Sequence, residues 1–98
     1  MKNKISDSLK EIFYCLIADE YEVENTIKEL SYLSMEEQER VREEFRKIID
    51  QRLWSQDFYL GLTGFEFEAE DGFYAYLEEV WQYLFNQGPE PDIEKYWY

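Results

Sequence analysis

The stretch SMEEQERVREEFRKIIDQRL, Ser34 to Leu53, decides the fold class. Ser34 and Glu37 form a capping box, the S-x-x-E pattern that starts helices because each side chain satisfies a free backbone N–H of the first turn. After it, apolar residues recur at the spacing of one helix face, at Val41, Phe45, Ile48 and Ile49. The stretch therefore predicts a helix from Met35 to about Leu53, with a charged outer face.

Three more helices are predicted around this one. The first spans residues 6–18 with Ser6 as its cap, the second spans about 20–32 after Asp19, and the last runs from Gly72 to Asn86 after Asp71. With only 98 residues, the chain makes a single domain, residues 1–98. The apolar faces predict a shared core of Leu9, Ile12, Leu16, Ile27, Leu30, Val41, Phe45, Ile48, Phe73, Leu77, Val80 and Leu84.

Residues 54–70 break the helical pattern. Gly61 and Gly64 interrupt the segment, and Phe65, Phe67 and Ala69 alternate with glutamates. A period of two indicates a strand, so the region around residues 57–70 is either a short β-hairpin that includes residues 58–62 or an irregular loop. The fold class is mainly α, a compact bundle of about four helices.

The charge of the chain limits its partners. Twenty-three acidic and ten basic residues give a net charge of −13, which argues against direct binding of nucleic acid or an anionic membrane. Aromatic residues make up 19% of the chain, so it can bury a core despite its charge. One cysteine cannot form an internal disulfide, and we find neither a signal peptide nor an apolar run of membrane-spanning length. We therefore expect a cytoplasmic protein.

Catalytic patterns are missing from the sequence. It has no histidine, no G-x-S-x-G and no phosphate-binding glycine loop. Glu78 and Glu79 are adjacent, so on a helix they point about 100° apart and do not converge on one reacting atom. The acidic run EFEAEDGF, Glu66 to Phe73, does not fit a calcium loop, because Phe67 and Ala69 fall where ligands belong. We expect no enzyme activity, no cofactor and no metal site.

The acidic residues are distributed unevenly. The 42 residues from Leu53 to Glu94 contain ten carboxylates and no Lys or Arg, whereas the first fifty residues mix both signs. Fourteen aromatic residues lie between Trp54 and Tyr98. Tyrosine and tryptophan often anchor interfaces. The helix over residues 73–85 carries an apolar and aromatic arc of about 200°, wider than an ordinary core-facing stripe.

These two asymmetries predict a surface that binds a basic protein. The candidate residues combine the acids with four aromatic anchors: Asp57, Glu66, Glu68, Glu70, Asp71, Tyr74, Glu78, Glu79, Trp81, Tyr96 and Trp97. The most concrete hypothesis is an immunity protein or inhibitor that neutralises a bacterial toxin of the nuclease type, because a nuclease cleft is basic. The alternatives are a phage-type mimic of nucleic acid that blocks a DNA-binding or CRISPR enzyme, and an adaptor or subunit of a larger assembly.

Overall fold

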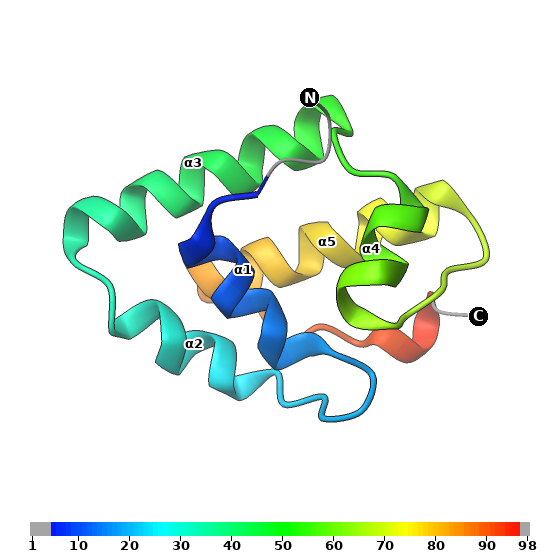
Figure 1. Cartoon of the computed structure of the whole chain (residues 1–98), viewed down its shortest axis with the longest axis horizontal. Helices are drawn as coiled ribbons and strands as arrows, with labels where there is room; N and C mark the ends of the chain where they lie inside the picture. The colour runs from blue at the N-terminus through cyan, green and yellow to red at the C-terminus, as the bar shows by residue number, and fades with distance from the viewer. Residues whose placement is uncertain (1–4, 97–98) are drawn as a thin grey trace.

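The computed structural model describes residues 5–96, which fold into five α-helices and two short 3₁₀ helices and contain no strand (Figure 1). Helix α5 (Glu70–Phe85) runs through the middle of the molecule, and α3 (Met35–Gln51) packs along one side of it. Helix α1 (Asp7–Phe13) packs against both α3 and α2 (Glu24–Ser31). The predicted mainly helical fold is confirmed, with five helices where about four were expected.

The N-terminal half begins as the sequence indicates. The Ser6 hydroxyl caps α1 by accepting a hydrogen bond from the Leu9 amide at 3.3 Å, and the helix continues as the 3₁₀ helix Tyr14–Leu16. The second helix starts later than predicted, at Glu24, and Asp19 lies in the connecting loop. The two helices are therefore shorter than their apolar spacing suggested.

The predicted core position Ile27 is wrong. Its side chain is 39% exposed, while Thr26 beside it is completely buried. The Thr26 hydroxyl donates to the Val23 carbonyl at 2.6 Å, which removes the cost of burying a polar group. The inward face of α2 is thus turned by one residue, and Val23, Thr26 and Leu30 form it.

The capping box of α3 is only half formed. The Ser34 hydroxyl accepts from the Glu37 amide at 3.1 Å, as predicted. The Glu37 carboxylate instead accepts a hydrogen bond from the Ser8 hydroxyl at 2.8 Å. This contact joins the start of α3 to α1. At its other end, α3 stops at Gln51 and is followed by Arg52, whose backbone is left-handed with φ 50°.

The prediction of a hairpin or loop over residues 57–70 is wrong in its first half, which is helix α4 (Gln56–Thr63). The Ser55 hydroxyl caps this helix by accepting from the Phe58 amide at 3.0 Å. Tyr59 and Thr63, four residues apart, form its buried face. The helix was missed because apolar residues occur on all sides of the short segment, so its period is hidden.

The second half of that segment is an extended loop between α4 and α5. Phe65 and Phe67 are buried and Glu66 and Glu68 are exposed, so the alternation seen in the sequence is real. It does not create a strand within residues 5–96. Instead, the Gln56 side-chain amide donates to the Phe67 carbonyl at 3.0 Å and ties the loop to the first turn of α4.

The core is rich in edge-to-face aromatic contacts. Every predicted core residue except Ile27 is buried. The Phe13 ring also meets Phe45, Trp54 and Tyr59 at centroid distances of 5.2, 5.2 and 5.8 Å. These contacts bring α1, α3 and α4 together at one point in the core.

Candidate functional site

Glu78, one of the predicted binding acids, is part of the fold. The Arg46 guanidinium from α3 binds both of its carboxylate oxygens, at 2.6 and 3.0 Å, and also binds Asp50 at 2.9 Å. These hydrogen bonds lower the pKa of Glu78 and raise that of Arg46. The pair links α5 to α3, so the charge of Glu78 is largely neutralised within the molecule.

Glu79 is engaged in a similar way by the C-terminal segment. It accepts hydrogen bonds from the Tyr96 hydroxyl and from the Asp92 amide, and it lies 3.2 Å from the Lys95 amine. Burial acts to raise the pKa of Glu79, but these partners outweigh it and lower the pKa. Tyr96 is half-buried against Gly72, so it secures the C-terminal segment to α5.

Two aromatic residues predicted as anchors, Tyr74 and Trp81, are buried in the fold. Tyr74 is 4% exposed, and its hydroxyl bonds the backbone N–H and C=O of Trp54. Trp81 is 8% exposed, and its indole N–H donates to the Arg42 carbonyl at 3.1 Å. Both rings face the protein because α5 is the central helix, which also explains its wide aromatic arc. The fourth predicted anchor, Trp97, lies outside the described residues.

The remaining predicted acids lie at one end of the molecule. We call them the acidic edge: Asp57, Glu66, Glu68, Glu70 and Asp71. Arg52 lies 3.1 Å from Asp71 and 3.5 Å from Glu70, yet these two side chains remain 91% and 58% exposed. Asp57, Glu66 and Glu68, here called the free acids, are exposed and have no hydrogen bond or ion pair from their side chains within residues 5–96. The edge therefore carries more negative charge than its single guanidinium can balance.

The acidic edge also carries apolar groups that the sequence reading did not single out. Leu53 and Leu60 are 43% and 39% exposed, and Leu60 shares the outer face of α4 with Asp57, three residues earlier. Had residues 56–63 been recognised as a helix, this spacing would have revealed the shared face. Exposed leucines beside unpaired carboxylates suit a protein surface better than a small ion.

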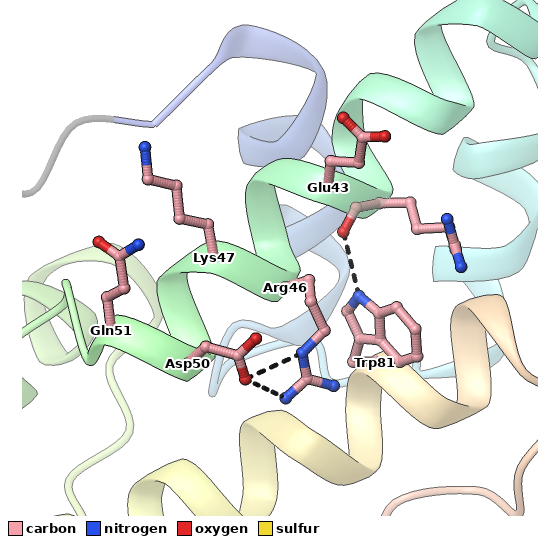
Figure 2. A pocket seen from close by; sticks show the side chains of 7 residues that line it. Glu43, Arg46, Lys47, Asp50, Gln51 and Trp81 are labelled. Carbon is pink, nitrogen blue, oxygen red and sulfur yellow. Dashed lines mark hydrogen bonds and ion pairs between the residues drawn. The ribbon is translucent and has the colours of Figure 1, made fainter.

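A shallow groove of about 340 Å³ lies elsewhere, between α3 and Trp81 (Figure 2). The Arg42 and Arg46 guanidinium groups lie over the Trp81 ring at 5.6 and 4.9 Å from its centroid. Lys47 and Gln51 line the groove but point away from α5 (Figure 2), and neither side chain forms a hydrogen bond or ion pair with another described residue. Basic and acidic side chains both line the groove, and its Arg46 is already bound to Asp50 and Glu78.

The remaining chemistry of the chain is sparse. Burial and the nearby carboxylates Glu29, Glu22 and Glu11 raise the pKa of Cys15, which disfavours the nucleophilic thiolate. No group of three or more possible ligands in the described part of the chain could hold a metal ion. Within residues 5–96, no helix has both the length and the apolar character that a membrane crossing requires.

Comparison with known proteins adds no relative: no protein-family model, curated protein or solved structure matches this chain. The candidate site therefore rests on the structure of this chain alone. It is the acidic edge together with the exposed residues Leu53 and Leu60.

Proposed function

We propose that this protein is a small acidic binding protein whose acidic edge occupies a basic site on a protein partner. The observation that supports the proposal is the set of free acids, Asp57, Glu66 and Glu68, which are exposed and unpaired in a domain of net charge −13. Unpaired like charges repel one another and lower stability. A basic partner would turn this cost into attraction and would be steered toward the edge.

The surroundings of the acidic edge support rapid, specific docking. The loop that carries Glu66 and Glu68 is held by two buried phenylalanines on its inner side and by Gln56 at its backbone. The start of α5 is held by Arg52. Groups that are already ordered lose little conformational freedom when a partner binds, which favours affinity.

The most concrete form of this function is an immunity protein or inhibitor that neutralises a bacterial toxin, especially a nuclease. A nuclease concentrates Lys and Arg where it holds phosphates, and an acidic edge with exposed leucines complements such a cleft. On this proposal the protein performs no catalysis itself and acts by covering the site of the toxin.

Mimicry of nucleic acid is the second candidate, and the loop geometry favours it. Glu66 and Glu68 are exposed on either side of Phe67, which is buried, so we infer that they extend to the same side of the loop. Alternate residues of an extended chain are about 7 Å apart, so the carboxylates form a short row. Such a row could stand in for backbone phosphates on a DNA-binding or CRISPR enzyme.

A capture experiment with two baits tests the proposal. The wild-type protein and a variant with the three free acids replaced by lysine are immobilised, and retained proteins are quantified by mass spectrometry. We expect a basic protein that only the wild type retains, and whose nuclease or DNA-binding activity falls when wild type is added. Equal retention by both baits would show that the acidic edge is not the binding site. A partner without nuclease activity or DNA binding would favour the adaptor alternative.

A further inference from the structure

Helix α4 turns one narrow face to solvent. Asp57, Leu60, Gly61 and Gly64 are exposed at the spacing of a single helix face, while Tyr59 and Thr63 are buried behind them. We call these four exposed residues the α4 face. It lies at the end of the molecule that carries the acidic edge, and Asp57 belongs to both.

Gly61 has the most open surroundings of the four glycines in the described part of the chain. Gly64 has φ 86° and follows the last residue of α4, a Cβ on Gly88 would lie 2.9 Å from the Gln82 Cβ, and a Cβ on Gly72 would make ordinary contact with the Tyr96 side chain at 3.7 Å. A Cβ on Gly61, in contrast, would meet no atom within 4 Å. Glycine inside a helix is less favourable than alanine, and nothing in the described part of the chain compensates here.

We propose that the α4 face seats a basic segment of the protein partner, with the aliphatic stem of a lysine or arginine lying over Gly61 and against Leu60. Such side chains bury their stems on apolar surface while their charged heads remain near polar groups. Here the head would reach Asp57 or the neighbouring loop carboxylates. The missing side chain at Gly61 leaves room for that close approach. This inference rests on the proposed function and names the contact through which it acts.

Charge selects this occupant over the alternatives. A nucleic acid or a second copy of this chain would bring negative charge to a domain that already carries −13. The groove beside Trp81 is a weaker candidate, because its Arg46 is already bound to Asp50 and Glu78. The exposed corner at Tyr32 and Met35 has apolar area, but its surroundings show no feature that selects a partner.

A side chain at Gly61 should stabilise α4, and a large one should also weaken binding. Gly61→Ala should raise the melting temperature by roughly 2–8 °C, because alanine favours the helix and meets open space. Gly61→Gln keeps the charge and fills the space, so it should weaken binding of a short oligo-arginine peptide by about fivefold or more. Ser31→Ala in α2 is the control: it also favours a helix, but away from the α4 face, and should leave peptide affinity unchanged.

Isothermal titration calorimetry at low salt measures the affinity of each variant for the oligo-arginine peptide, and an oligo-glutamate peptide is the control ligand. NMR of the backbone amides shows which residues the peptide contacts. The Gly61 and Gly64 amide signals should shift on binding, and the Gly88 signal should not. If Gly61→Gln binds like wild type while the variant lacking the three free acids does not, the inference fails and the proposed function stands. If that charge variant binds like wild type, or wild type binds no basic peptide, the proposed function fails as well.

Discussion

Replacing Tyr74 by phenylalanine should destabilise the domain by about 2–4 kcal/mol. The hydroxyl accepts a hydrogen bond from the Trp54 amide at 3.0 Å and donates one to the Trp54 carbonyl. Trp54 is 2% exposed, so water does not readily replace either bond. Each of the two buried backbone groups left without a partner costs about 1–3 kcal/mol, and we place the total at about 2–4 kcal/mol because larger losses from one substitution are exceptional. The sum is a large share of the about 5–15 kcal/mol that stabilises a typical domain.

The substitution isolates the hydroxyl because it keeps the ring. The Arg52 guanidinium lies 5.0 Å from the centroid of the Tyr74 ring, and phenylalanine preserves that contact and the packing. Urea denaturation followed by far-UV circular dichroism measures the change, with the slope of the transition expected to stay constant. Tyr32→Phe is the matched control, because Tyr32 is 71% exposed and should change stability by less than about 0.5 kcal/mol.

The result that refutes this reasoning is a Tyr74→Phe variant within about 0.5 kcal/mol of wild type, the range of ordinary surface changes. Binding supplies a second check. If Tyr74 were an interface anchor, the variant would keep its stability and lose affinity for the partner. A structural role predicts lower stability with unchanged affinity under conditions in which the variant is folded.

Other predictions concern the core, the ion pairs and the acidic edge. Leu77→Ala should cost about 2–5 kcal/mol in urea denaturation, whereas Ile27→Ala should cost less than about 1 kcal/mol because Ile27 is exposed. The hydrogen bonds from the Arg46 guanidinium are the chief cause of the lowered pKa of Glu78. The stability that this carboxylate adds is therefore present above its ordinary pKa of 4.5, and it is lost as the pH falls through the pKa of the folded state. Stability curves of wild type and Glu78→Gln should therefore differ at neutral pH and converge in acid. Reversing Glu66 and Glu68 to lysine should slow association with the basic partner and weaken its dependence on salt, measured as on-rates across a salt series, while a charge reversal on the outer face of α3 should change little.

The helices with clear caps and clear periods could be predicted from the sequence. Ser6 and Ser34 cap α1 and α3 as the sequence indicates, because capping depends only on neighbours along the chain. Helix α4 could not be recognised from its apolar pattern. Its helical state depends on burying Tyr59 among aromatic residues from other helices, a contact that no local pattern shows.

The candidate site could also be predicted only in part, because local sequence shows where acids occur but not which tertiary contacts they make. Net charge and the long span without bases predict an acidic surface in the second half, where Asp57, Glu66 and Glu68 are exposed; exposed acids such as Glu20, Glu36 and Glu43 also occur in the first half. Which acids remain unpaired depends on tertiary contacts, such as that between Arg46 and Glu78, 32 residues apart. Likewise, the sequence shows that Tyr74 and Trp81 lie on an aromatic helix but not that this helix is central, so their burial could not be inferred.

Two pairs of acids in the second half differ in their contacts, and we expect them to have opposite effects on stability. Glu78 and Glu79 are paired with cations that hold α3 and the C-terminal segment, so neutralising either one should destabilise the fold. Glu66 and Glu68 have no such pairs, and replacing them with lysine should relieve repulsion in a strongly acidic domain and stabilise it. A residue whose replacement stabilises the isolated protein and weakens its binding is retained for function and not for folding. The sign of the stability change, measured alongside the on-rate, therefore tests whether the acidic edge exists for a partner.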